Sequence, residues 1–204
     1  MIGNDIIDLS EANQKSRWQK RGFPERIFTK KEQSFLSCSS DPELMIWLLW
    51  SLKESVFKAS AQIRMSKYFY PLKYEFIPES FSFRKKIISG NEFNSVIKYA
   101  DILFNAESII TVRYISSYVN NKDVRGEVLK GVLKLSGRTY EIQHREVYSS
   151  FIRNYSRISG IKQKFLNVKK DIYGVPHLYE NDRLTDCRIS FSHHGEYGAY
   201  FCYM

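Results

Sequence analysis

Residues 41–65 form the stretch that most constrains how this chain can fold. Asp41 can cap a helix with Pro42 at its first position, and no glycine or proline follows before Pro71. Apolar side chains occupy most of the circumference of this helix, which predicts that it is largely buried. We therefore expect one long helix around which the rest of the chain is organised.

Three charged residues, Lys53, Glu54 and Lys58, interrupt the apolar surface of this helix. They need a partner or a ligand, because burying an unpaired charge is costly. One interpretation is structural: Glu54 and Lys58 form an ion pair four residues apart, while Lys53 extends past its apolar neighbours. The other is that a carboxylate and two ammonium groups hold a metal ion and an anionic substrate. The helix alone does not decide between them.

The composition indicates a folded, basic protein. The 204 residues are 43% hydrophobic and 15% aromatic, which suffices for one substantial core or for two small domains that share one. The formal net charge is +9 and the pI is about 9.4. Such a charge favours nucleic acid, anionic lipid, a phosphorylated ligand or an acidic protein as partner.

The cysteines and the first residues predict a reducing, cytoplasmic compartment. Cys38, Cys187 and Cys202 are odd in number and lack metal-ligand spacing, which argues against a disulfide framework and a structural zinc site. Residues 1–9 lack a cationic segment and contain two aspartates, unlike a signal peptide. No apolar run reaches the length of about 18 residues that a membrane span needs, so we expect no membrane partner.

Residues 1–9 predict a short strand that carries two acids, Asp5 and Asp8. Residues three apart on an ideal strand point to opposite faces, so only a turn after Ile7 would bring these carboxylates together. Asp8 or Ser10 can instead cap the helix that follows. The two acids are therefore either one site or two separate features.

The remaining segments predict strands and further helices. Residues 11–36 form two basic helical pieces, the second with a capping box of Thr29 and Glu32, and this surface is either solvated or binds an acidic partner. Residues 118–123 resemble a linker between two halves, and residues 127–135 fit a helix or a strand. Other expected elements are strands at 68–76, 80–89 and 108–116, a helix at 145–158, and a hairpin of 187–193 with 197–203.

The first arm of this hairpin combines small hydroxylic residues with histidines. Ser190, Ser192 and His193 leave room for the polar groups of a ligand, although a structural histidine with a satisfied hydrogen bond is the alternative. The sequence contains no Gly-x-Ser-x-Gly elbow, Walker loop, Gly-x-Gly-x-x-Gly or His-Glu-x-x-His motif. The familiar hydrolase, nucleotide and zinc-protease signatures are thus excluded.

Three short motifs together resemble the signature elements of the 4'-phosphopantetheinyl transferase superfamily. They are Gly3-x-Asp5, Trp50-Ser51-x-Lys53-Glu54-Ser55-x-x-Lys58 and Ser190-x-Ser192-His193. Residues 3–9 and 21–32 resemble the holo-acyl-carrier-protein synthase branch, whereas the Trp-Ser start of the central motif is more similar to the surfactin-synthetase-type branch. Residues 148–178 and the hairpin resemble the usual N-terminal half of the surfactin-type enzymes, although here they come last.

The resemblance implies an α+β fold of two similar halves in exchanged order, residues 1–121 and residues 122–204. Each half would be a long helix packed on a small antiparallel sheet, with pseudo-two-fold symmetry and the site between the halves. One chain would then build the site as a monomer. The reaction implied is the Mg²⁺-dependent transfer of the 4'-phosphopantetheine group of coenzyme A to a serine of an apo carrier protein.

The resemblance also assigns roles to individual residues. Asp5 and Glu54, with Asp8 third, would hold Mg²⁺, and the catalytic set would be Glu54, Lys58 and Lys53. The serine proton would pass to Glu54, to a neighbouring carboxylate or to a metal-bound water. The implied contacts to coenzyme A are His193, Ser192, Lys53, Lys58, Lys170 and Pro176. Carrier proteins of this kind are acidic, so Arg17, Arg21 and Arg26 would form a docking face, with no nucleic-acid partner required.

Two positions depart from the family pattern. Relatives commonly have Gly-Lys-Pro where this chain has Gly174-Val175-Pro176, so that lysine contact is missing or comes from Lys169 or Lys170. Relatives also place a second acid where this chain has Ile7. The alternatives are therefore a member that binds coenzyme A without transferring it, and a basic nucleic-acid-binding module that uses its many aromatic residues for stacking.

Overall fold

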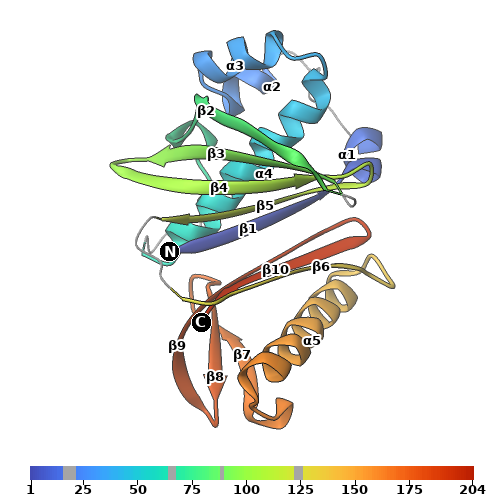
Figure 1. The fold of residues 1–204 in the computed structure, drawn as a ribbon, viewed down its shortest axis with the longest axis vertical. Coiled ribbons are helices and arrows are strands. Elements are labelled where there is room, and N and C mark those ends of the chain that lie inside the picture. Colours follow the sequence, from blue (N-terminus) through green and yellow to red (C-terminus); the bar gives the residue numbers. More distant parts are fainter. Residues whose placement is uncertain (16–21, 64–67, 88–89, 122–125) are drawn as a thin grey trace.

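The fold consists of two halves with the same connectivity, each a five-stranded antiparallel sheet covered by one long helix (Figure 1). The computed structural model describes residues 1–15, 22–63, 68–87, 90–121 and 126–204. The strand order is β1-β5-β4-β3-β2 in the first sheet and β6-β10-β9-β8-β7 in the second. The expected α+β fold of two similar halves is confirmed.

In each half a strand is followed by helices and then by four further strands, the last of which pairs with the first. The first half contains β1 (Ile2–Asp8), α1 (Leu9–Lys15), α2 (Phe23–Ile27), α3 (Lys30–Ser37), α4 (Pro42–Ala61), a 3₁₀ turn at Pro71–Lys73, β2 (Tyr74–Ile87), β3 (Gly90–Tyr99), β4 (Ile102–Ile110) and β5 (Tyr114–Asn121). The second half contains β6 (Val128–Lys134), α5 (Tyr140–Ser159), a 3₁₀ turn at Gln163–Phe165, β7 (Leu166–Lys170), β8 (Pro176–Glu180), β9 (Arg183–His194) and β10 (Tyr197–Tyr203).

The long helix predicted from the sequence is α4. Asp41 caps it, since its Oδ1 accepts a hydrogen bond of 3.0 Å from the backbone N–H of Leu44, and Pro42 is its first residue. The helix ends at Ala61, earlier than the expected residue 65. Its apolar side packs on the first sheet, where Leu48, Leu49 and others join the core.

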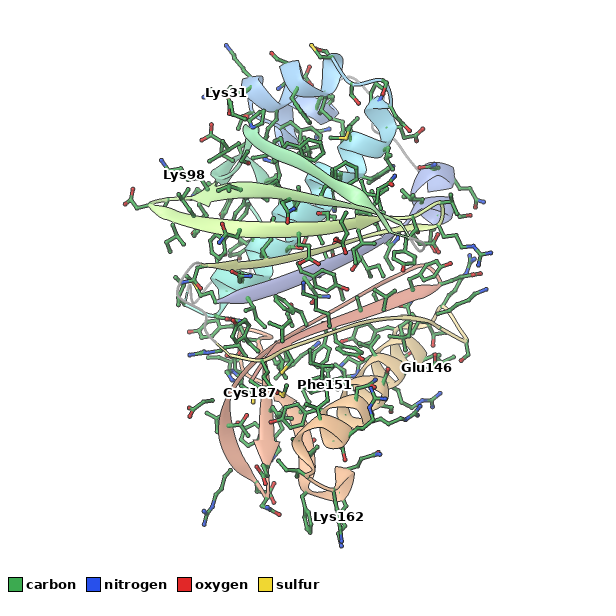
Figure 2. All side chains as sticks on the ribbon, in the orientation of Figure 1. Lys31, Lys98, Glu146, Phe151, Lys162 and Cys187 are labelled. Carbon is green, nitrogen blue, oxygen red and sulfur yellow. The ribbon has the colours of Figure 1, made fainter. Side chains whose placement is uncertain are left out.

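Each half has its own hydrophobic core. In the second half Phe151 projects from α5 toward the sheet and is fully buried (Figure 2). Smaller clusters lie where the halves meet, with Ile2 against Phe201 and Ile6 against Tyr197. The two halves therefore share an apolar interface as well as polar contacts. No helix in the described ranges is long and apolar enough to cross a bilayer.

Strand β1 lies between the two halves and is buried along its whole length. One face meets α4 at Gly3, where a β-carbon would come within 2.0 Å of the carbonyl oxygen of Ser55. The other face meets the second sheet at Asn4, whose backbone N–H and side-chain amide donate to Ser190 and Ser192 at 3.1 and 2.8 Å. Residues on this strand are thus held from both sides.

Several expected boundaries were wrong. Residues 108–116 do not form one strand, because the Thr111 hydroxyl accepts the backbone N–H groups of Arg113 and Tyr114 and so forms a turn between β4 and β5. Residues 118–121 belong to β5 and pair with β1, so they are no linker. Residues 68–73 precede β2, which begins only at Tyr74.

Other expectations are settled by the described elements. The segment 127–135 contains the strand β6, and the capping box of Thr29 and Glu32 at the start of α3 is confirmed. Residues 122–125 lie outside the described residues, and the division of the chain at residues 121 and 122 stays a prediction.

Candidate active site

Burial along α4 separates two groups of side chains. Trp50, Glu54, Phe57 and Lys58 are half-buried and recur at helical spacing, so they share one stripe. The side chain of Lys53 is fully buried and points about 100° away from that of Glu54, toward the core. Glu54 and Lys58 are therefore the charged residues of the central motif that face the surface.

Strand β1 places Asp5 next to this stripe. Its carboxylate oxygen Oδ1 lies 2.8 Å from Lys58 Nζ, and the two side chains are 11% and 28% exposed. Asp5 shares the face of β1 with Gly3, whose lack of a side chain allows β1 and α4 to approach closely. The expected meeting of the opening strand with the central helix is therefore present in the structure.

Glu54 completes a cluster of two carboxylates and one ammonium group. Burial, together with the nearby negative charge of Asp5, raises the pKa of Glu54 to about 7, although the positive charge of Lys58 opposes both effects. When both carboxylates of this cluster are ionised, their negative charge exceeds the positive charge of Lys58. A carboxylate with a pKa near neutrality beside a second carboxylate is typical of a functional site.

The donor set at this cluster fits a magnesium ion. Asp5 and Glu54 offer hard carboxylate oxygens, and Mg²⁺ is usually held by one or two carboxylates together with phosphate oxygens and water. The described part of the chain contains no group of three or more His, Cys, Asp or Glu side chains that could enclose a metal alone. The residues present therefore suit a metal that a phosphorylated ligand helps to hold.

A cavity of about 410 Å³ opens beside Lys58 between the two halves. The end of α4 forms its first wall through Phe57, Lys58, Ala61 and Gln62. The second half forms the other wall from α5, the turn between β7 and β8, and strand β9, which contribute His144, Val147, Tyr148, Lys170, Tyr173, Gly174, Val175, Pro176, Ile189, Ser190, Phe191 and His193. Neither half alone encloses this space.

Two histidines and Lys170 give the second wall its polar character. Burial lowers the pKa of His193, as do the positive charges of Lys58, His144 and Lys170, so its imidazole is neutral near pH 7. Burial and Lys170 likewise lower the pKa of His144. The rings of Tyr140 and His193 lie 5.5 Å apart edge to face. This wall thus combines flat rings with the cationic side chain of Lys170.

The turn at residues 171–176 shows how the chain manages without a lysine at position 175. Asp171 Oδ1 accepts the backbone N–H groups of Tyr173 and Val175 at 2.8 and 2.9 Å, and Val175 is buried. Lys170 pairs in register with Pro176 and lines the same cavity. Lys170 therefore brings a cationic side chain to the cavity, whereas Val175 brings an apolar one.

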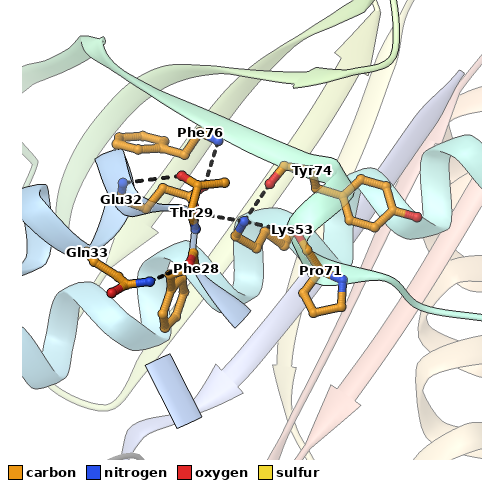
Figure 3. Close-up of polar contacts among 8 residues, drawn as sticks. All are labelled: Phe28, Thr29, Glu32, Gln33, Lys53, Pro71, Tyr74 and Phe76. Atoms are coloured by element: carbon orange, nitrogen blue, oxygen red, sulfur yellow. Dashed lines mark hydrogen bonds and ion pairs between the residues drawn. The ribbon is translucent and has the colours of Figure 1, made fainter. Parts of the chain in front are cut away.

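Lys53 does not line the cavity. Figure 3 shows the protein groups that it contacts instead. Its Nζ is 2.8 Å from Glu32 Oε2 and also donates to the carbonyl oxygens of Pro71 and Tyr74. Burial lowers the pKa of Lys53, whereas the carboxylate of Glu32 raises it. The expected contact of Lys53 with the phosphates is therefore corrected, because its ammonium group is enclosed by protein acceptors.

Asp8 does not converge with Asp5. Strand β1 continues through Asp8 without a turn, so the two carboxylates point to opposite faces. Asp8 Oδ1 accepts the N–H groups of Ser10 and Glu11 at the start of α1, and its Oδ2 accepts that of Glu196 at 2.9 Å. The expected metal ligand is instead a helix cap that also joins the two halves.

Ser192 also belongs to the joint between the halves. Its hydroxyl accepts the side-chain amide of Asn4 and is buried, while Ser190 lines the cavity in its place. Of the expected docking residues, Arg26 is exposed on α2, and its Nε donates to the carbonyl oxygen of Gly22. Arg17 and Arg21 lie outside the described residues.

His144 was missed because the expected helix began one residue after it. Thr139 caps α5 by accepting the N–H of Ile142, so the helix includes Tyr140 and His144 and brings both to the cavity side. The threonine followed by Glu141 was the sequence signal for this earlier start. That signal would have placed a second histidine beside His193.

This arrangement defines a class of site: paired carboxylates beside a basic, ring-lined cavity, suited to a metal ion and a phosphorylated nucleotide. A model of the 4'-phosphopantetheinyl transferase superfamily matches residues 1–112, more than half of the chain. The chain therefore belongs to this superfamily, which makes it a phosphopantetheinyl-transferase-type enzyme. The matched range contains Asp5, Glu54 and Lys58, whereas the second wall of the cavity lies beyond it.

Similarity to individual known proteins is lower. A search of curated protein sequences gives no match. Among solved structures, the chain is similar to the holo-[acyl-carrier-protein] synthase of Thermotoga maritima, with 14% identity and a TM-score of 0.39 over 90% of this chain and 83% of that chain.

Proposed function

We propose that this protein transfers the 4'-phosphopantetheine group of coenzyme A to a serine of an acidic apo carrier protein. The observation that carries the proposal is the cluster of Asp5, Glu54 and Lys58, whose lysine lines a cavity with Lys170 and His193 on its opposite wall. Two carboxylates beside a cavity that two lysines line suit a magnesium pyrophosphate next to a nucleotide.

The reaction breaks one bond and forms another at phosphorus. The serine hydroxyl oxygen attacks the phosphorus atom that carries the pantetheine arm, and the bridging oxygen of the pyrophosphate leaves with adenosine 3',5'-bisphosphate. Magnesium, when bound by Asp5 and Glu54, would neutralise the pyrophosphate and make its bridging oxygen a better leaving group. Lys58 stabilises the charge that moves onto the phosphate oxygens.

The proton of the serine needs an acceptor near the cluster. The pKa of Glu54 is about 7 in the metal-free protein, and magnesium bound to its carboxylate would lower that pKa, so the serine proton would pass to Glu54 or to a metal-bound water. Asp5 is committed to Lys58 at 2.8 Å, which makes it the poorer acceptor. We therefore assign Glu54 as metal ligand first and proton acceptor second.

The second half would bind the nucleotide end of coenzyme A. Lys170 and the imidazole of His193 face the cavity, where an anionic phosphate would bind between them and raise the pKa of that imidazole. The flat rings of His144 and Tyr148, whose centroids are 3.9 Å apart, form an apolar surface for a base. Pro176 closes this side of the cavity.

The carrier protein would approach along α2 and the exposed stripe of α4. Phe23 of α2 stacks on Trp50 of α4 with ring centroids 6.4 Å apart, and Arg26 is exposed on the same short helix. Arg26 can meet an acidic group of the partner, and the ring pair offers it an apolar contact beside the site.

The test is a transfer assay with coenzyme A, magnesium and several apo carrier proteins, read by the mass of the carrier. We expect pantetheinylation that a chelator abolishes and that Glu54→Ala or Asp5→Ala lowers by at least about 100-fold. Lys98→Met, an exposed lysine on β3, is the matched control and should keep full activity.

The alternatives predict other outcomes in the same assay. If coenzyme A binds while every carrier stays unmodified, the protein is a binding member without transfer activity. If coenzyme A does not bind but RNA or DNA does, with affinity that falls steeply as salt rises, the protein is a nucleic-acid-binding module and the proposal fails.

A further inference from the structure

The ion pair between Glu32 of α3 and Lys53 of α4 is the most deeply buried pair of opposite charges in the described structure (Figure 3). Both side chains are 0% exposed, and Lys53 Nζ lies 2.8 Å from Glu32 Oε2. The carbonyl oxygens of Pro71 and Tyr74 accept from the same ammonium group. Neither charge faces the cavity, so the proposed reaction leaves both without a direct role.

Glu32 binds three separate parts of the first half. Its Oε2 accepts the backbone N–H of Thr29 at 2.7 Å, its Oε1 accepts that of Phe76 in β2 at 2.7 Å, and Lys53 binds it from α4. Lys53 also lies over the ring of Phe28, 5.8 Å from its centroid. The pair therefore joins the segment before α3, strand β2 and the helix that carries Glu54.

The segment formed by α2 and α3 is held by apolar side chains as well as by Glu32: Phe28, between the two helices, is fully buried, and Phe23, Ile27 and Phe35 pack against the first core. Helix α2 has five residues and none of them is buried, while α3 buries only Glu32 and Leu36. Helices this short are not stable by themselves in water. Glu32 is the buried charged residue among these anchors, so it adds to the apolar packing a contact whose geometry is directional.

A buried ion pair is a weak source of stability compared with apolar side chains of the same volume, but its geometry is directional. Here it links α3 to the core-facing side of α4 at one defined separation. Glu54, the next residue, then points about 100° away, onto the exposed stripe. The pair therefore fixes the position of the α2–α3 segment relative to Glu54, the proposed metal ligand.

We infer that the Glu32–Lys53 pair is a positioning element that holds the α2–α3 segment on the catalytic helix for carrier docking, and that Lys53 makes no contact with coenzyme A. The docking role rests on the proposed function. The placement of the segment does not, and it can be measured without any transfer reaction.

The test compares the wild-type protein with the double variant Glu32→Gln/Lys53→Met, which removes both charges and so leaves no buried charge without a partner. We expect the KM for the carrier to rise five- to tenfold, kcat to stay within threefold, and the Kd for coenzyme A with magnesium to stay within twofold. The single variant Lys53→Arg, in which Glu32 is intact, should keep most of the affinity for the carrier, since a guanidinium can still bind Glu32. Lys98→Met is the exposed control.

Hydrogen exchange supplies the readout that does not depend on transfer. In the double variant the amides of residues 24–37 should exchange at least tenfold faster, while those of residues 47–59 in α4 keep their protection. Lys53→Met alone should lower the melting temperature more than the double variant, because it leaves Glu32 charged and buried.

Three results would overturn the inference. A loss of coenzyme A affinity of tenfold or more in the double variant would show that Lys53 reaches the phosphates. Unchanged carrier KM with unchanged exchange at residues 24–37 would show that the pair positions nothing. If the amides of residues 47–59 in α4 exchanged faster by the same factor as those of residues 24–37, the pair would have a general structural role. If the wild-type protein transfers nothing, the proposed function fails, and exchange and coenzyme A binding still decide the role of the pair.

Discussion

At the scale of single residues, Glu54 should make the metal-free protein less stable as pH rises. Its pKa is about 7 in the folded protein and 4.5 in its ordinary state, so the folded protein binds more protons between these values. The free energy of unfolding therefore falls as pH rises from about 4.5 to about 7, by up to roughly 3 kcal/mol. Glu54→Gln removes this loss, so at pH 8 and without magnesium the variant should unfold at higher denaturant concentration than the wild type.

The comparison at about pH 4 is the internal control. There the wild-type carboxyl is largely protonated in both states, so the two proteins should have nearly the same free energy of unfolding. His144 and His193 have lowered pKa values and act in the opposite direction, but they are present in both proteins and cancel in the difference. A difference that does not change with pH would contradict the placement of Glu54.

Single residues also show where sequence reasoning stops. The resemblance of the motifs to the superfamily placed Asp5, Glu54 and Lys58 at one site, and in the structure Asp5 and Lys58 are in contact. Lys53 belongs to the same motif, yet its partner Glu32 is 21 residues away in the chain, on a helix whose packing no local pattern reveals. Motif membership therefore did not distinguish a surface charge from a buried one.

At the scale of elements, the contact between β1 and α4 should depend on Gly3. A β-carbon there would lie 2.0 Å from the Ser55 carbonyl oxygen and 2.7 Å from the Ala59 backbone nitrogen, so Gly3→Ala must push the strand from the helix. We expect a loss of about 2–3 kcal/mol in the free energy of unfolding, typical of an overpacked contact. Magnesium-dependent transfer should fall by more than tenfold, since Asp5 moves away from Glu54.

Gly160→Ala gives the matched comparison. Gly160 ends α5 with φ of 76°, and no atom lies within 4 Å of the position that a β-carbon would take. The substitution should cost about 1 kcal/mol through backbone strain and leave transfer unchanged. Equal losses of transfer in both variants would mean that the distance between β1 and α4 does not control the site.

The elements with strong local signals were predictable. A cap, an uninterrupted apolar run and helical spacing defined α4, and the expected hairpin of residues 187–193 with 197–203 lies within the paired strands β9 and β10. The turn at Thr111 was hidden because threonine is itself a strand residue, and its side-chain hydrogen bonds to Arg113 and Tyr114 appear only in three dimensions. Residues 118–121 resemble a linker in sequence because they are polar and turn-prone, and their pairing with β1, more than 100 residues earlier in the chain, exists only after folding.

At the scale of the whole molecule, the two halves share one topology but contribute different parts of the site. Strand β6 is the counterpart of β1, and its Gly131 faces Tyr200, whose ring occupies the space where a β-carbon would be. Tyr200 in turn accepts a hydrogen bond of 2.9 Å from Asn154 of α5. In the second half a tyrosine therefore occupies the region that corresponds to the charged cluster of the first half. The second half contributes a wall of the cavity instead.

A single chain that holds both walls should build its site without a second copy. Asp8, Asn4 and β9 join the halves by hydrogen bonds within one chain, so the wall with Lys170 and His193 meets Lys58 of the same molecule. We expect Glu54→Ala and His193→Ala each to lose most transfer activity, and a mixture of the two variants to recover none. Recovery toward about a quarter of wild-type activity after co-refolding would mean that the walls come from different chains, as in a closed oligomer. The rate per molecule should also stay constant on dilution from micromolar to nanomolar protein, because a site within one chain does not dissociate.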